Sequence, residues 1–366
     1  MLKVLIDARW IEKPRGLGRY VREMLYAIAR EDFGDAEIIV LTPEGSEEHV
    51  SSLGTFKIVT LRAWPVPIWE QFIVPWWAWR LRVDLVHSPC NTTSLMLSKM
   101  RVQNLVTIHD LMFFEGHGST LYQRLGNLYR RFIVSRFKRR GLTLVAVSRA
   151  TRDRVREKFG IDAAVIYEPV ANFVRVAGNV SGVSRRLGGR AYFVHIGGLA
   201  AHKNTQLVVD AFRAATLCDY CLVILGVPRS ARAVGNWLAD DVVIPGWISD
   251  AEVARYIAGA TALIFPSLAE GYGLPILEAF SLGCPVITSA IAPMTELAGD
   301  AAFLVDPRSM AMVTDACRRL GSDDALCRLL RERGLRRAAE FSAERIGREL
   351  MAAYSRAAGV QHVGTS

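Results

Sequence analysis

The sequence predicts an α/β protein of two domains, each built on a parallel β-sheet covered by helices. Short apolar runs alternate with helix-like segments in the first half, and the same alternation starts again at Ala191. Strands that alternate with helices pair in parallel through right-handed crossovers. Two such runs in a chain of 366 residues therefore predict two Rossmann-like domains that face each other across a cleft.

The first half opens on Leu2–Ile6, a mostly apolar run that predicts a strand. Later apolar runs of similar length are separated by segments whose apolar residues recur three or four positions apart, which is the spacing of a helix face. These patterns predict strands near 2–7, 37–42, 57–61, 84–87, 103–109, 142–147 and 163–167, and helices over 18–30, 69–81, 119–140 and 149–158.

The second half repeats the pattern from Ala191–Ile196 onward. Between the halves, residues 171–188 have weak periodicity and small polar residues, as an exposed linker would. We therefore expect domains at 1–170 and 189–345, with a C-terminal helix and tail, 346–366, that can pack back on the first domain. Strands are expected near 191–196, 221–225, 242–245, 261–265, 284–288 and 301–304, with helices between them and closing helices near 307–320, 322–338 and 341–357.

Composition narrows the class of protein. No stretch reaches the roughly 18 uninterrupted apolar residues of a membrane-spanning helix, and the N-terminus enters the first strand without a signal-peptide pattern. We therefore expect a cytoplasmic protein. The net charge is +9 and the pI is about 9.4, and the basic excess lies mainly in residues 1–170. A basic balance of this size favours an acidic partner, either an anionic membrane surface or a nucleic acid.

The most informative stretch runs from the apolar segment Ala262–Pro266 into a glycine-rich turn and then a helix whose first position can accept Pro275. Glu270 falls in the turn and Glu278 inside the helix, near its start. Free amides and a positive helix end between the two carboxylates suit an anion. The pair therefore suggests a ligand with phosphates in the middle and sugars at each end. Either acid can instead serve only to complement the helix dipole.

This motif resembles the E-x7-E signature of the family 4 glycosyltransferases. The resemblance implies the B-type fold of that family, an acceptor-side first domain, a nucleotide-sugar-binding second domain, and transfer with retention of the anomeric configuration. Other segments fit the same family in order along most of the chain, namely Asp7–Arg9, Gly16–Tyr20, Thr107–Asp110, Val147–Arg149, Ala191–Leu199, Lys203–Asn204, Gly283–Ser289 and Glu296–Ala302.

The resemblance assigns roles to residues of the motif. It implies that Glu278 accepts hydrogen bonds from the ribose, and that Glu270 contacts hydroxyls of the donor sugar and is catalytic. The amides of Gly271, Tyr272, Gly273 and Leu274 are expected to meet the diphosphate. Lysine can neutralise phosphate, which favours a catalytic role for the lysine after the preceding glycine strand, Lys203, although it can also be an ordinary loop lysine.

Other candidates follow from the same resemblance. Gly198 stands where the family often has a basic residue, so His202 or another cation is expected to compensate, and Gly198 itself is expected near the donor. Ile248 stands where the family brackets the nucleotide base with main-chain groups, although an ordinary core role is also open. No Asp-x-Asp-like motif ends a strand, so we expect no metal and no other cofactor.

The first half adds four candidate residues. His109 ends an apolar run, at the edge of the sheet where ligands gather; by resemblance it contacts the donor sugar, and we count it as catalytic. Asp110 can orient that ring or bind acceptor hydroxyls. Gly16 and Gly18 come too late after Asp7 for a dinucleotide fingerprint, which favours a loop that closes over the donor diphosphate or admits the acceptor; a plain turn is the alternative.

Segment Ser119–Arg140 carries basic residues and no acid, interleaved with apolar ones, and tryptophans lie nearby. It reads as a basic amphipathic helix that can dock to anionic lipid, or as a helix with a solvated basic face. The whole pattern predicts a retaining glycosyltransferase at the inner face of the cell membrane. It would move a sugar, with mannose from GDP-mannose as the first donor, to a lipid-linked glycan in bacterial polysaccharide or O-antigen synthesis. The alternatives are a synthase or phosphorylase with a small soluble acceptor and, more distantly, a basic nucleic-acid-binding protein.

Overall fold

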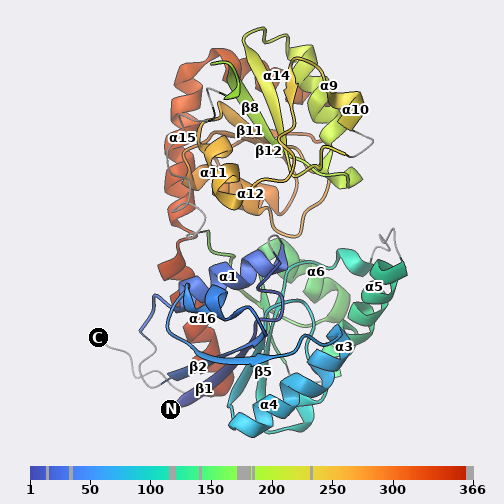
Figure 1. The fold of residues 1–366 in the computed structure, drawn as a ribbon, viewed down its shortest axis with the longest axis vertical. Coiled ribbons are helices and arrows are strands. Elements are labelled where there is room, and N and C mark those ends of the chain that lie inside the picture. The colour runs from blue at the N-terminus through green and yellow to red at the C-terminus, as the bar shows by residue number, and fades with distance from the viewer. Residues whose placement is uncertain are drawn as a thin grey trace. The chain divides into compact units, whose positions relative to one another are not determined.

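The computed structural model describes residues 1–359 except 14–15, 33–35, 115–120, 140–141, 171–182, 184–185 and 231–233. The chain divides into two compact units (Figure 1). The first comprises Met1–Pro169 and the segment from Ser342 onward, and the second comprises Val170–Phe341. The second domain was expected to run to 345, so it ends earlier than predicted. Most of the expected linker, 171–182 and 184–185, lies outside the described residues.

The first unit is built on a parallel sheet in the order β3-β2-β1-β4-β5-β6-β7. Its central strands are buried apolar runs, which is typical of a parallel sheet covered on both faces. Every strand falls where the sequence predicts one, although β7 is shorter than expected. The strands are β1 (Leu2–Asp7), β2 (Ala36–Pro43), β3 (Lys57–Leu61), β4 (Leu85–Ser88), β5 (Gln103–Ile108), β6 (Thr143–Ala146) and β7 (Ala164–Val165).

The helices of the first unit differ from expectation in two predicted segments, and the short helix over Glu47–Ser51 was not expected. The segment expected over 69–81 starts earlier and contains a π-helical turn, η1 (Trp69–Ile73), between α3 (Val66–Ile68) and α4 (Val74–Leu81). The segment expected over 119–140 is α5 (Leu121–Val134) followed by the 3₁₀ turn η4 (Phe137–Arg139); residues 119, 120 and 140 are not described. The other elements are α1 (Leu17–Ile28), α2 (Glu47–Ser51), η2 (Leu97–Lys99), η3 (Met112–Phe114), α6 (Arg149–Phe159) and α16 (Ala343–Ala358).

The C-terminal helix α16 packs along α1 in the first unit (Figure 1). A side chain at Gly347 would collide with the carbonyl oxygen of Ala27, so glycine allows the two helices to approach closely. On the same helix, the hydroxyl of Tyr354 lies 2.7 Å from Nδ1 of the buried His87. These contacts explain why the last helix belongs to the first unit although it follows the second in sequence.

The second unit has a parallel sheet in the order β10-β9-β8-β11-β12-β13. The strands are β8 (Ala191–Ile196), β9 (Tyr220–Leu225), β10 (Val242–Val243), β11 (Ala262–Phe265), β12 (Val286–Ser289) and β13 (Phe303–Val305). The helical elements are η5 (Ala201–Lys203), α9 (Thr205–Ala215), α10 (Val234–Trp237), α11 (Asp250–Ala258), α12 (Leu274–Ser281), α13 (Met294–Ala298), α14 (Met310–Ser322) and α15 (Asp324–Ala339). Both sheets therefore confirm the predicted fold class of two Rossmann-like domains.

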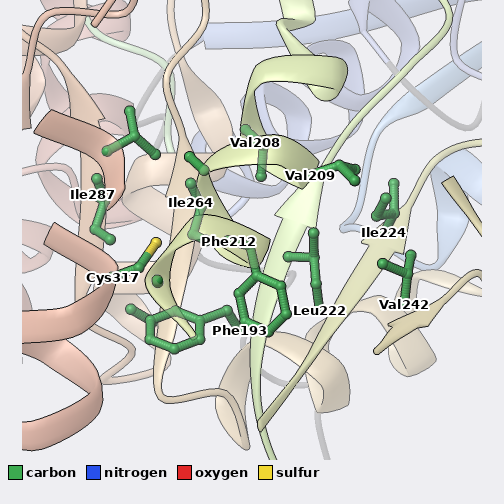
Figure 2. Packing of buried hydrophobic residues seen from close by; sticks show 14 of the residues in the cluster. Phe193, Val208, Val209, Phe212, Leu222, Ile224, Val242, Ile264, Ile287 and Cys317 are labelled. Carbon is green, nitrogen blue, oxygen red and sulfur yellow. The ribbon is translucent and has the colours of Figure 1, made fainter. Parts of the chain in front are cut away.

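Figure 2 shows the apolar core on one side of the second sheet. Phe193 of β8 and Phe212 of α9 meet with ring centroids 6.1 Å apart and planes at 63°. Strand residues such as Ile264 and Ile287 and the thiol of Cys317 from α14 complete this layer. The core holds β8 and β11 side by side, which fixes where the loops after those strands begin.

Serine side chains cap several helices. In each case the serine oxygen accepts a hydrogen bond from a backbone amide three residues later, which satisfies one of the donors left unpaired at a helix start. The capping residues are Ser148, Ser249, Ser309 and Ser342. Within the described residues, no helix combines the length and hydropathy needed to span a bilayer.

Candidate functional site

The strand order of the second sheet reverses between β8 and β11, which is where ligands bind in open parallel sheets. The loops after these two strands adjoin. The backbone amide of Leu268 donates to the carbonyl oxygen of His202 at 2.8 Å. The side chain of Asn204 donates to the carbonyl oxygens of Pro266 (3.1 Å) and Pro307 (2.6 Å). These hydrogen bonds therefore hold the two loops together at the carboxyl-terminal edge of the second sheet.

Lys203 and Glu270 form an ion pair across this edge. Nζ of Lys203 lies 2.7 Å from Oε1 of Glu270, and the two side chains are 23% and 13% exposed. The ammonium also lies 5.1 Å from the ring centroid of Phe265 at the end of β11. The structure thus brings together two residues that the sequence assigns to different parts of one ligand. One ammonium N–H and one carboxylate oxygen are used, which leaves donor and acceptor capacity on both groups.

The turn that follows Glu270 delivers the chain into α12. Gly273 has a φ of 118°, a left-handed conformation that favours glycine. Gly271 is half-buried and Tyr272 is buried. No side chain caps the N-terminus of α12, and the positive end of a helix suits an anion. Leu274 is the first helical residue, so Pro275 occupies the second position rather than the first as expected.

Glu278 lies inside α12 and is only 2% exposed. Its neighbours on the helix, Leu277 and Ala279, are fully buried. Burying a carboxylate so deeply is costly unless partners satisfy it. The structure does not test the contact of Glu278 with a ribose, so that contact stays a prediction.

Gly198 and Ile248 lie in other loops of the second unit. Gly198 is half-buried, and a Cβ added there would touch Cγ of Lys203 at 3.4 Å. The missing side chain thus leaves the stem of Lys203 unobstructed. Ile248 is half-buried and precedes Ser249, the cap of α11. The structure does not assign either residue to a ligand.

His109 lies in the first unit, directly after β5, and is buried. Its ring nitrogens approach two acceptors: Nδ1 lies 2.8 Å from Oε1 of Glu168, and Nε2 lies 2.7 Å from the carbonyl oxygen of Pro89. Beside an ionised Glu168 both nitrogens donate, which makes the ring a cation. Burial opposes the charge, but the hydrogen bond and charge of Glu168, with the Pro89 carbonyl, outweigh it and raise the pKa of His109. Contact between a ring nitrogen and a ligand therefore requires one of these bonds to be exchanged.

The structure also places the other candidates of the first unit, Asp110, Gly16 and Gly18. Asp110 accepts from the backbone amide of Met112 at 2.9 Å, so it stabilises the turn that starts η3. Gly16 precedes α1 with a φ of 60° and is exposed. Gly18 is buried, and a side chain there would collide with the carbonyl oxygens of Trp10 and Lys13. Gly18 thus has a packing role that the sequence did not indicate.

Sequence reasoning missed a buried carboxylate, Glu70, in the π-helical turn η1. Its two oxygens accept from the hydroxyls of Thr92 (2.6 Å) and Tyr129 (2.8 Å). Burial raises the pKa of Glu70 to about 7, against these two hydrogen bonds. Asp7, which accepts from Nε1 of Trp69 at 2.8 Å, also acts on Glu70 by charge repulsion. The sequence did hold a signal for a special role of this residue, because Glu70 is the only acidic residue between positions 62 and 82.

Two family models match this chain, one for each of the two units. Residues 14–171 match the family described as "Glycosyltransferase Family 4", and residues 190–323 match the one described as "Glycosyl transferases group 1". The chain belongs to glycosyltransferase family 4. All of the second-unit candidates from Gly198 to Glu278 lie within the second match, and His109, Gly16 and Gly18 lie within the first.

Two curated relatives of this family 4 chain are O-antigen chain mannosyltransferases. Mannosyltransferase B of Escherichia coli is 29% identical over 46% of this chain and 47% of its own length. RfbU of Salmonella typhimurium is 26% identical over 59% of this chain and 60% of its own length. The chain thus spans about half the length of these relatives.

Two solved structures show the same fold over nearly the whole family 4 chain. A sucrose-phosphate synthase of Thermosynechococcus elongatus has a TM-score of 0.74 and 17% identity, covering 97% of this chain and 99% of its own. The Anabaena protein Alr3699/HepE, solved in complex with UDP and glucose, has a TM-score of 0.72 and 15% identity, covering 97% and 100%. At such identities the likeness concerns the fold alone.

Proposed function

We propose that this chain transfers a sugar from a nucleotide diphosphate donor to a glycan acceptor. The observation that carries the proposal is the ion pair of Lys203 and Glu270 at the switch point of the second sheet, beside the uncapped start of α12. Membership of glycosyltransferase family 4 supports it, because the pair lies within a segment that matches a glycosyl transferase family.

The geometry suggests how the reaction is helped. When the bond between the sugar and the diphosphate breaks, positive charge builds on the sugar and negative charge on the departing diphosphate. The remaining N–H groups of Lys203 and the positive end of α12 can stabilise the diphosphate, since groups fixed in advance need not reorganise. The free oxygen capacity of Glu270 can hold hydroxyls of the donor sugar. As the acceptor oxygen bonds to the sugar, its proton passes to the departing phosphate oxygen, and the nucleoside diphosphate leaves.

The finer parts of the proposal concern donor, acceptor and stereochemistry. We take mannose from GDP-mannose as the first donor, with support from the two O-antigen mannosyltransferases among its relatives. The acceptor would be a lipid-linked glycan of bacterial polysaccharide or O-antigen synthesis, reached at the inner face of the cell membrane. Transfer would retain the anomeric configuration without a metal ion. The basic residues of Ser119–Arg140 would hold the enzyme at anionic lipid.

Thermal shift measurements test the donor. The intact protein is heated with GDP, GDP-mannose, UDP, UDP-glucose and dTDP-glucose in turn, because a ligand that binds only the folded state stabilises it by about 2.7 kcal/mol at a hundredfold excess over Kd. We expect GDP and GDP-mannose to stabilise the parent and Lys203→Ala to lose most of that shift. Lys57→Ala, which removes a surface lysine paired with Glu37 in the first unit, is the matched control. No stabilisation by any nucleotide would contradict the proposal.

A further inference from the structure

A continuous helical segment of the first unit, 66–81, carries large apolar side chains on its solvent side. It runs through α3, η1 and α4. Its exposed apolar residues are spaced four, four and three positions apart, which places them along one face of a helix. They are Ile68, Phe72, Trp76 and Trp79, which are 38%, 62%, 51% and 65% exposed.

Helix α5 carries a second stripe of the same kind. Its inner face packs in the core through Ile133 and Val134, which are 1% exposed. Its outer face nevertheless bears large apolar residues, spaced four, three and four positions apart. They are Leu121, Leu125, Leu128 and Phe132, which are 74%, 58%, 63% and 50% exposed. A surface helix of a globular protein normally places polar residues on that face.

The two stripes lie on neighbouring elements. The hydroxyl of Tyr129 on α5 donates to Oε2 of Glu70 at 2.8 Å and accepts from Nε2 of Gln71 at 2.9 Å. Tyr129 follows Leu128 in sequence, and Gln71 precedes Phe72. We call the eight exposed side chains of the two stripes the apolar ridge. An exposed apolar surface built from two adjoining helices indicates an interaction site.

The charge around the ridge indicates the partner. Residues 62–82 and 121–138 contain one acid, Glu70, and it is buried among hydroxyls. Their basic residues are Arg62, Arg80, Arg82, Arg124, Arg130, Arg131, Arg136 and Lys138. Three of them make hydrogen bonds within the unit: Arg131 donates to the carbonyl oxygen of Phe113 (2.7 Å), Arg136 to that of Phe132 (2.6 Å), and Arg130 to Oδ1 of Asn127 (3.0 Å). Apolar residues that include tryptophan, flanked by cations without exposed acids, match the boundary between headgroups and acyl chains in an anionic bilayer.

We propose that the apolar ridge inserts into the interface of an anionic membrane, with its basic neighbours at the level of the lipid phosphates. This inference deepens the proposed membrane contact and rests on it. It differs from binding by basic residues alone in the source of the affinity. Apolar side chains on two helices supply a part of the binding energy that salt does not screen. Basic residues acting alone would lose their attraction at about 1 M salt, where the screening length is about 3 Å.

Vesicle sedimentation tests the ridge. Vesicles of phosphatidylcholine with phosphatidylglycerol are mixed with the intact protein at low salt and at about 1 M salt. We expect the parent to bind at both, more weakly in salt. A variant with Phe72→Gln, Trp76→Gln, Leu125→Gln and Leu128→Gln should bind at least tenfold more weakly at low salt and not at all in high salt. Replacing Arg124, Arg130 and Lys138 by Gln should abolish only the salt-sensitive part.

The control variant carries Leu329→Gln and Leu335→Gln. These residues of α15 in the second unit are 41% and 46% exposed, so the change removes exposed leucine side chains outside the ridge. It should bind vesicles like the parent. Lipids with brominated acyl chains should quench the tryptophan emission of the parent, and replacing Trp76 and Trp79 by Phe should remove most of that quenching.

Several outcomes would overturn the inference: no vesicle binding by the parent, loss of all its binding in salt, equal binding by parent and ridge variant, or no quenching. A different result would also overturn it: the parent is a dimer, the ridge variant is a monomer, and neither binds vesicles. A second copy of the chain would then cover the ridge. Thermal shifts with nucleotides are measured on the same proteins. Nucleotide binding without vesicle binding refutes the ridge alone, and vesicle binding without nucleotide binding refutes sugar transfer alone.

Discussion

The buried pair of His109 and Glu168 makes a prediction that can be worked out from the structure, and Glu168→Gln is the change that tests it. The two side chains are 8% and 5% exposed, and their atoms approach to 2.8 Å. Glutamine keeps the shape of the side chain, and its amide oxygen can still accept from Nδ1. The variant therefore removes the charge and leaves the packing intact.

The expected loss of stability follows from burial. Removing one partner of a buried ion pair costs about 3–5 kcal/mol, because the other charge is left uncompensated. The amide oxygen still accepts one hydrogen bond, so we expect a smaller loss, about 2–3 kcal/mol.

The pH dependence has a definite sign. The folded structure raises the pKa of His109 above its unfolded value of about 6.5. The stability contributed by the pair is therefore fully present below about pH 6.5 and is lost as the pH rises through the folded pKa. In Glu168→Gln the negative charge that offsets burial is lost, so burial favours the neutral ring and lowers the pKa of His109 relative to the parent. Other groups that act near the ring are Asp110, His87, Tyr20 and Cys90, all unchanged in the variant.

Thermal unfolding followed by circular dichroism, at about pH 5.5 and about pH 9 on either side of the unfolded pKa, measures the effect. We expect the melting temperature of Glu168→Gln to fall further below that of the parent at the lower pH. Glu349→Gln, which breaks an exposed pair with Arg345 in the same unit, is the control and should cost less than about 1 kcal/mol at either pH. An equal fall for Glu168→Gln at both pH values would refute the charged form of His109.

Three further predictions concern the proposed reaction and the fold. Lys203→Ala and Glu270→Ala should each lower sugar transfer at least tenfold, about 1.4 kcal/mol of barrier, while circular dichroism shows folded protein; parental rates in either variant would mean that the site is misassigned. Turnover should persist in excess EDTA, because Lys203 and the positive end of α12 can stabilise the diphosphate; loss on chelation that magnesium or manganese restores would contradict this. Gly18→Ala should lower the melting temperature, since its methyl group would collide with the carbonyls of Trp10 and Lys13, and an unchanged melting temperature would count against that packing.

Much of the fold could be predicted from local pattern. Runs such as Ala191–Ile196 and Ala262–Phe265 are buried along their whole length or nearly so, and a continuous apolar run leaves few alternatives to a central parallel strand. The lengths of strands at the edge of a sheet were harder to predict. β10 is only Val242–Val243, shorter than the expected 242–245, because an edge strand has one neighbour to define its length.

The candidate site divides in the same way. Glu270 and Glu278 could be found because a strand, a glycine turn and a helix follow each other within one short stretch. The ion pair between Lys203 and Glu270 could not, because the two residues are far apart in sequence and meet only when β8 and β11 become neighbours. The partners of His109 were hidden for the same reason, since Glu168 follows a different strand.

The sequence by itself determined the fold class, the two-domain division, the motif residues and the basic, acid-free composition of 119–140, because each depends on the spacing of residues along one segment. Only the tertiary structure decided which side chains meet and which remain exposed. It buries Glu70 beneath hydroxyls, charges His109 by enclosing it between two acceptors, and leaves the leucines of α5 outward. Helical periodicity shows that a stripe exists, but which face is covered depends on the elements that pack against the helix.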